Sequence, residues 1–306
     1  MEAVFDFFLV CVMLGVIYCF LAIFSMMQLF LLIYRDCCIG NGIVSCEFNT
    51  LTTQKQMHLI IMILASCRTV FCYLAYEVWD PSTGLVTHSS LSADIISFHL
   101  LDDLSHLLFF SLSSLLTLFW AEVVYTAVDR EGDAFRQSGL RLWISLTNAA
   151  AYCALLLSSA VEVDGVDRED THYMHDPSAV AISVLYLTTA LCLVYYTRAA
   201  NTELRQVPVE LEVRRQRTFH LDLLSGAVGT SLLLGAVAMI VFDNQSLTLG
   251  GVPLSLTLSL ILLYFLLLEI FPLAVIIWYY RFSFNFSKNR SSERDRERMR
   301  ERERER

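Results

Sequence analysis

Seven stretches of the 306-residue chain are long and apolar enough to cross a lipid bilayer. A crossing helix needs about 20 mostly apolar residues, and each stretch reaches that length with few or no charged residues. Because lipid-exposed backbone must pair its own N–H and C=O groups, each stretch is expected to be a helix. The predicted helices cover about 7–34, 56–79, 98–126, 141–161, 177–198, 219–242 and 253–280.

The composition agrees with a chain whose main partner is the lipid bilayer. Hydrophobic residues make up 56% of the sequence and the mean hydropathy is +0.54, outside the range typical of soluble domains. The sequence therefore predicts an all-α, polytopic membrane protein with one seven-helix transmembrane domain over 1–290. The remaining segment, 291–306, alternates Arg with acidic residues, which predicts a disordered cytosolic tail.

The orientation follows from the distribution of basic residues. All but two of the 22 Lys and Arg residues fall in the connections and the tail on one side; the exceptions are Arg68 within a helix and Arg168 in an opposite loop. Since cytosolic loops carry the excess of basic residues, the N-terminus is predicted to face the exterior or lumen and the C-terminus the cytosol.

Motifs of catalysis and of nucleic-acid binding are missing from the sequence. It has no Gly-rich phosphate loop, no His-Glu-x-x-His and no Cys-x-x-Cys, so no enzyme activity, cofactor or metal is expected. The net charge of −9 gives no reason to expect a nucleic-acid partner.

Four polar residues gather near the predicted exterior end of the third helix. His99, Asp102 or Asp103, and His106 are spaced to lie along one side of a helix. Two imidazoles and a carboxylate could hold a metal or relay protons, and a hydrated polar vestibule is the alternative. A ligand-sensing cavity near His99, Asp103 and His106 also stays open, with the small-molecule ligand unknown.

Arg68 lies near the middle of the second predicted helix. A charge at that depth is costly, so Arg68 is expected to face the interior of the bundle and find a carboxylate. By depth along the helices, Asp103 and Glu269 are the two candidates, whereas Glu122 lies too near the cytosol. The alternative is an Arg held only by backbone carbonyls and water.

Two modification sites can be assigned on the predicted topology. Cys37 and Cys38 follow the first predicted helix at the cytosolic face, where S-acylation is a candidate and two reduced thiols are the alternative. Asn244 begins the sequon Asn-Gln-Ser in an exterior loop, close to the membrane, and is a candidate glycosylation site.

Motifs in three helices resemble a known family. Gln54-Lys55 and His58-Leu59, followed by the intramembrane Arg68, resemble the second helix of the tobamovirus multiplication protein family of plant seven-pass membrane proteins. The stretches Leu107-Leu-Phe-Phe-Ser111 and Leu118-Phe-Trp-Ala-Glu122 are similar to its third helix.

The seventh predicted helix extends this resemblance, because Glu269-Ile-Phe-Pro272 is similar to the Glu-Ile-x-Pro segment of the family. The resemblance assigns family-motif positions to His58, Trp120, Glu122 and Pro272. It implies a vacuolar-membrane protein that recruits cytosolic proteins to its face. It also implies a relation to lysosomal, receptor-like seven-pass proteins of animals.

These expectations combine into one leading hypothesis, a non-enzymatic scaffold that anchors cytosolic partners at a vacuolar, lysosomal or other endomembrane. A receptor-like sensor of an exterior or luminal ligand is the first alternative, and it would fit the plasma membrane as well. A proton-coupled transporter is the second.

Overall fold

The computed structural model describes residues 2–39, 53–78, 93–128, 139–165, 177–206, 211–243 and 254–280. Within these ranges the chain is helical, and seven helices are long and apolar enough to cross a membrane. The seven spans are Asp6–Tyr34, Thr53–Ala75, Leu100–Tyr125, Leu140–Leu157, Val180–Glu203, Thr218–Ile240 and Ser259–Tyr280. The predicted all-α, seven-span fold class is therefore confirmed.

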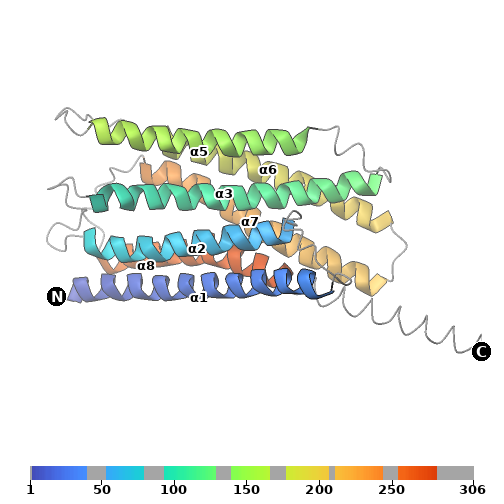
Figure 1. The fold of residues 1–306 in the computed structure, drawn as a ribbon, viewed down its shortest axis with the longest axis horizontal. Helices are drawn as coiled ribbons and strands as arrows, with labels where there is room; N and C mark the ends of the chain where they lie inside the picture. The colour runs from blue at the N-terminus through green and yellow to red at the C-terminus, as the bar shows by residue number, and fades with distance from the viewer. Residues whose placement is uncertain are drawn as a thin grey trace, which may run out of the picture.

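The elements are long helices, most of which run side by side, while the orange helix at residues 211–243 crosses the others obliquely (Figure 1). Their bounds are α1 Glu2–Ile39, α2 Thr53–Val78, α3 Ala93–Val128, α5 Leu140–Gly165, α6 Pro177–Gln206, α7 Leu211–Asp243 and α8 Leu254–Tyr264, followed by the π-helix η1 Phe265–Ile270 and an α-helical segment 271–280.

Several helices extend beyond the apolar stretches. α6 and α7 continue into charged sequence around Arg205 and Arg215 on the predicted cytosolic side. The apolar criterion ends a helix at the first cluster of charges, whereas backbone hydrogen bonding continues into water. Cys37 and Cys38 accordingly lie on the last turn of α1 rather than after it.

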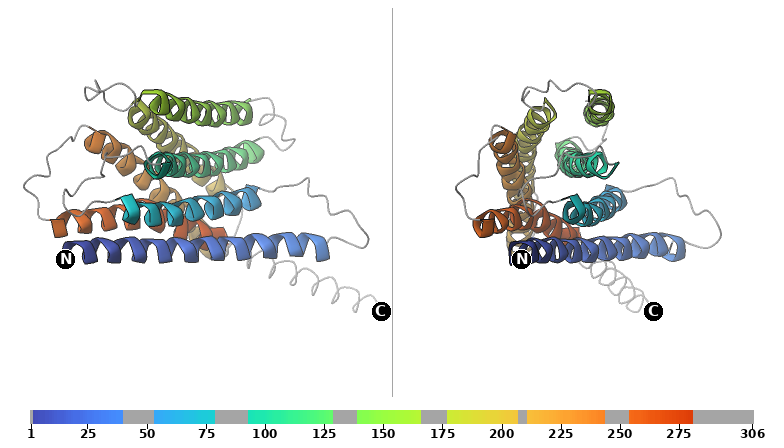
Figure 2. Two further views of the ribbon diagram at one scale, coloured as in Figure 1. Left: turned by 60° about the vertical axis from the view of Figure 1, so that its left-hand side comes forward. Right: turned by 90° about the vertical axis from the view of Figure 1, so that its left-hand side faces the viewer.

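α3 is the central helix and α5 is peripheral. The buried share of the most apolar window is 67% in α3 and 6% in α5, although both windows are apolar enough to cross a membrane. α3 packs against α2, α5 and α6, while α1 pairs with α2 and α6 pairs with α7. The two views of Figure 2 show α5 at the outer edge of the bundle. The exposed apolar faces suit contact with lipid.

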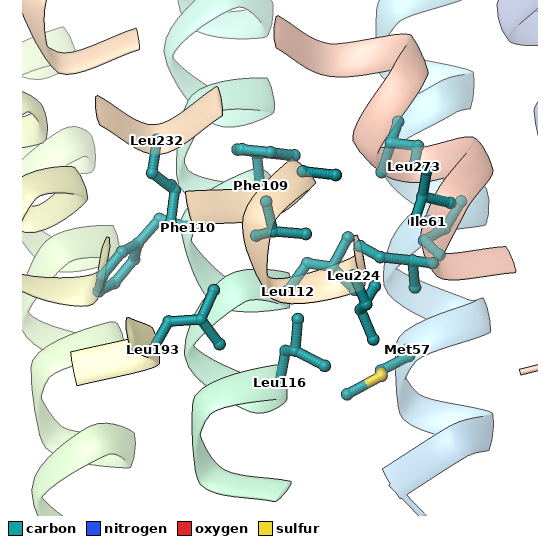
Figure 3. Close-up of a cluster of buried hydrophobic side chains, with 14 of the residues drawn as sticks. Met57, Ile61, Phe109, Phe110, Leu112, Leu116, Leu193, Leu224, Leu232 and Leu273 are labelled. Carbon is teal, nitrogen blue, oxygen red and sulfur yellow. The ribbon is translucent and has the colours of Figure 1, made fainter. Parts of the chain in front are cut away.

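The apolar core lies where α2, α3, α6 and α7 meet the last helix. Leu112 and Leu116 of α3 point toward Leu224 of α7, and Met57 of α2 lies beside them (Figure 3). All four side chains are fully buried. This layer separates the polar residues at the predicted exterior side of the bundle from the aromatic residues at the predicted cytosolic end.

Small residues let α6 and α7 approach each other closely. The Thr197 hydroxyl donates to Ser225 Oγ over 2.7 Å between the two helices. A Cβ added to Gly235 would lie 3.2 Å from the ring of Tyr186, tighter than most real contacts. Close approach at small residues is the usual way for membrane helices to associate.

Candidate functional site

Arg68 is the centre of a polar cluster inside the bundle. Its side chain is fully buried, and its guanidinium contacts two carboxylates. Nη1 donates to Asp102 Oδ1 over 2.5 Å, while Nε donates to Glu269 Oε2 over 2.8 Å and Nη2 donates to Glu269 Oε1. The expected pair between Arg68 and Glu269 is therefore present. A fork-to-fork pair of this kind is among the strongest polar contacts in proteins.

The carboxylate that α3 contributes to Arg68 is Asp102, where the sequence favoured Asp103. Successive residues of an α-helix differ in direction by about 100°, so the two side chains cannot share one face. Asp102 lies on the face of His106, whose Nε2 is 3.6 Å from Asp102 Oδ1. Depth along the helix had favoured Asp103, but direction around the helix selects Asp102.

His106 links the cluster to α6. Its Nε2 is 3.5 Å from Arg68 Nη2, and its Nδ1 is 3.2 Å from the Tyr186 hydroxyl. That hydroxyl donates to the backbone carbonyl of His106 over 3.0 Å. The side chain of His99 lies outside the described residues.

Tyr18 of α1 completes the cluster by donating to Glu269 Oε2 over 2.8 Å. Two aromatic rings cover the guanidinium, since Arg68 Cζ lies 5.1 Å from the centroid of Phe71 and 5.2 Å from that of Phe265. Cation–π contacts of this kind stabilise a charge that has left water. We call the polar set the Arg68 network. It consists of Tyr18, Arg68, Asp102, His106, Tyr186 and Glu269.

Pro272 explains why Glu269 lies in a π-helix. Proline has no backbone N–H, so the carbonyl of Leu268, four residues earlier, loses its regular donor. The N–H of Phe271 instead donates to Leu266, the five-residue spacing of a π-turn. Ser231 Oγ of α7 donates to the Leu268 carbonyl. The freed backbone group is thus satisfied by a neighbouring helix, as a membrane interior requires.

A second cluster lies at the other end of the same helices. His58 of α2 is buried, its Nδ1 is 3.3 Å from Ser25 Oγ, and that hydroxyl donates to the His58 carbonyl over 3.0 Å. The His58 ring is edge-on to Tyr280 at 6.4 Å, and Trp120 is edge-on to Tyr279 at 6.2 Å. We call His58, Trp120, Tyr279 and Tyr280 the aromatic end.

Two polar atoms of the aromatic end have no hydrogen-bond partner in the part of the chain that the structure describes. They are Nε1 of Trp120 and the hydroxyl of Tyr280, whose side chains are 3% and 6% exposed. Buried polar groups without partners are rare and destabilising. A polar group within hydrogen-bonding distance of either atom would remove this cost.

The remaining predicted positions lie apart from both clusters or outside the described residues. Glu122 is exposed on α3, while Pro272 is buried and acts on the backbone as described. The side chains of Cys37 and Cys38 are not described, nor are Asn244 and the tail 291–306. No group of three His, Cys, Asp or Glu residues suited to a metal ion occurs among the described residues.

Sequence reasoning missed Tyr18, Tyr186 and Ser231 as polar partners. Tyrosine and serine are common in membrane helices, so their types carry no signal of a specific contact. Pro272 alone gave a signal, because a proline inside an apolar helix frees a carbonyl that some neighbour must satisfy.

The arrangement defines a seven-span helical membrane protein whose interior charges are paired across helices. The sequence matches the THH1/TOM1/TOM3 domain over residues 4–292. The chain therefore belongs to the THH1/TOM1/TOM3 family, as its motifs suggested.

Two relatives carry the name Tobamovirus multiplication protein 1. The one from Nicotiana tabacum is 27% identical over 233 residues, covering 75% of this chain and 72% of the relative. The one from Arabidopsis thaliana is 28% identical over 238 residues, with coverage of 75% and 72%. No solved structure matches the chain significantly.

Proposed function

We propose that the protein is a non-enzymatic membrane anchor that binds cytosolic proteins at its cytosolic face, in a vacuolar, lysosomal or related endomembrane. Membership of the THH1/TOM1/TOM3 family supports this proposal, because the named relatives take part in the multiplication of tobamoviruses by their printed name. The observation that carries it is the pair of polar atoms at the aromatic end that have no hydrogen-bond partner among the described residues.

The two halves of the bundle suit this role. The Arg68 network joins α1, α2, α3, α6 and η1 through contacts between its own members, which gives a fixed frame. Trp120 and Tyr280 offer an indole N–H and a phenol O–H to an incoming polar group. A partner segment that enters between the helices can accept these hydrogen bonds, and such donors at a buried interface give specificity.

Proximity labelling from a C-terminal tag tests the proposal directly. The labelled cytosolic proteins should be retained on membranes that contain the wild-type protein and be reduced by Trp120→Phe combined with Tyr280→Phe. Trp143→Phe, on the exposed outer helix α5, is the matched control. Recovery of the same proteins from an unrelated seven-span protein of that membrane would refute the anchor function.

A receptor-like sensor is the second candidate, and one observation favours it. The side chain of Asp102 is 38% exposed although it contacts the fully buried Arg68. A cationic ligand on the predicted exterior side could reach Asp102 and compete for it. Ligand added to that side should then change which cytosolic proteins are labelled, whereas an anchor gives the same set with and without ligand.

A further inference from the structure

His106 lies between a cation and a carboxylate. Its Nε2 is 3.5 Å from Arg68 Nη2 and 3.6 Å from Asp102 Oδ1. A guanidinium can only donate hydrogen bonds, whereas an ionised carboxylate can only accept them. The same ring nitrogen can therefore accept from Arg68 while it is unprotonated, or donate to Asp102 once it carries a proton.

The contacts of His106 with Arg68 and Tyr186 fit the neutral ring. Arg68 Nη2 cannot accept a hydrogen bond, so Nε2 is the acceptor of that contact. The Tyr186 hydroxyl donates to the His106 carbonyl and therefore accepts from Nδ1–H at 3.2 Å. The neutral ring thus has its proton on Nδ1, and Nε2 keeps the lone pair that can bind a second proton.

Aqueous protons can reach His106 by way of Asp102. The side chain of His106 is 6% exposed, whereas that of Asp102, one turn earlier on α3, is 38% exposed. Both residues lie within the first two turns of the span Leu100–Tyr125, at the predicted exterior side. A carboxylate near the surface and a histidine one turn deeper are the kind of groups that relay protons into membrane proteins.

Groups of both signs face His106. The Arg68 guanidinium repels a proton on the ring, the Asp102 and Glu269 carboxylates attract one, and all three lie within electrostatic range. The other titratable groups on this helix and its neighbours are His99 and Asp103 on α3, Tyr186 of α6 at Nδ1, Tyr18 of α1 and Tyr264 of α8 beside Glu269, and Tyr152 of α5 beside Ser111.

We propose that His106 is a proton-binding site, reached from the predicted exterior side, whose protonation exchanges a contact between α3 and α2 for a contact within α3. The proton comes from the aqueous phase and adds to the lone pair of Nε2. The new N–H then faces Arg68 Nη2, another donor, and it donates to Asp102 Oδ1. That oxygen is the one that accepts from Arg68 Nη1.

The switch has a defined effect on helix packing. Arg68 keeps both contacts with Glu269, and Nδ1–H of His106 keeps its contact with Tyr186. Only the contact of Arg68 with Asp102, which joins α2 to α3, is weakened. The site thus couples proton activity on one side of the membrane to the packing of α2 against α3, and this inference does not depend on the anchor function.

Nuclear magnetic resonance of the full chain, with ¹⁵N-labelled histidine and arginine in lipid nanodiscs, tests the site. At about pH 8, one His106 nitrogen should give the signal of a protonated and the other that of an unprotonated imidazole nitrogen. Towards about pH 5, within the range in which histidines titrate, the unprotonated signal should be lost as imidazolium forms. His106→Gln assigns the signals by removing them, and Tyr186→Phe gives an independent assignment by shifting the Nδ1 signal.

The guanidinium signal of Arg68 reports the exchange of contacts. Arg68 is fully buried, so its N–H groups should exchange slowly with D₂O and be distinguishable from those of exposed arginines. In the wild type this signal should shift with the same midpoint pH as His106. In His106→Gln, whose amide oxygen accepts from Arg68 without titrating, the shift should be absent. His220→Gln, on α7, is the control and should keep both titrations.

Three results would overturn the proposal. One is a His106 ring that stays neutral from about pH 8 to about pH 5, the range over which it is expected to titrate. Another is a neutral ring with its proton on Nε2, which contradicts the acceptor role towards Arg68. The third is an Arg68 signal that shifts with pH in His106→Gln as it does in the wild type, since another group would then be titrating. The first two need only the wild type and the Tyr186→Phe assignment.

Discussion

The Arg68 network and the aromatic end use polar groups in opposite ways, although α2, α3 and the last helix contribute to both. In the network, hydrogen bonds join Arg68 to Glu269 and Asp102, and join His106 to Tyr186. At the aromatic end, Trp120 Nε1 and the Tyr280 hydroxyl have no partner among the described residues. The polar groups of the network are satisfied within the bundle, and in the proposed function those of the aromatic end are satisfied by a partner.

The comparison predicts its largest effect at Arg68. Arg68→Leu removes the charge that faces Glu269 and leaves that carboxylate buried without a cation. Removing one partner of a buried ion pair lowers the free energy of unfolding by roughly 3 to 5 kcal/mol. The folded yield and the melting temperature in detergent should therefore fall sharply. Arg198→Leu, at an exposed position of α6, is the matched control and should change neither strongly.

Tyr18→Phe should give the next largest effect, because it deletes one hydrogen bond to a charged group and nothing else. Such bonds contribute about 1.5 to 3 kcal/mol. The loss should be visible as a lower melting temperature, whereas Tyr73→Phe, at an exposed position of α2, should leave it unchanged. Equal melting of wild type and Tyr18→Phe would show that α1 is not attached through Glu269.

Ser231→Ala should have a smaller effect, because hydrogen bonds between membrane helices contribute about 0.6 kcal/mol on average and about 1.7 kcal/mol at most. The Leu268 carbonyl then lacks its donor from α7. Pro272→Ala returns a backbone N–H four residues after Leu268, so the double variant should recover part of the loss. If Pro272→Ala brings no recovery, the explanation given for the π-helix is wrong.

The smallest stability effect is expected at the aromatic end. Trp120→Phe and Tyr280→Phe each keep an aromatic ring and remove a polar atom that has no partner in the described part of the chain. The change in stability should therefore stay within about 1 kcal/mol and can be favourable. Binding of cytosolic partners should fall all the same. A stability loss as large as that of Arg68→Leu would mean that both halves serve the same purpose.

The sequence predicted the spans and the depth of the charges better than it predicted their partners. Apolar stretches of sufficient length specify helices in a bilayer almost without tertiary information, and the positions of Arg68 and Glu269 along them are enough to pair the two. Direction around the helix axis decided between Asp102 and Asp103, and it depends on the rotation that packing imposes.

The contacts of Tyr18, Tyr186 and Ser231 depend on which helices become neighbours, which no single stretch of the sequence encodes. Predicting the π-turn would have required two observations. One is the proline at 272, and the other is the serine on another helix that donates to the freed carbonyl. Only the first can be read from the local sequence.

The central claim is that Arg68 and Glu269 act as a pair that secures the predicted exterior half of the bundle. It is tested most directly by a double-mutant cycle that compares the free energies of unfolding of the wild type, Arg68→Leu, Glu269→Gln and the double variant. Residues in direct contact should show a coupling energy, so the loss of stability in the double variant should be clearly smaller than the sum of the two single losses. Losses that simply add would contradict the claim.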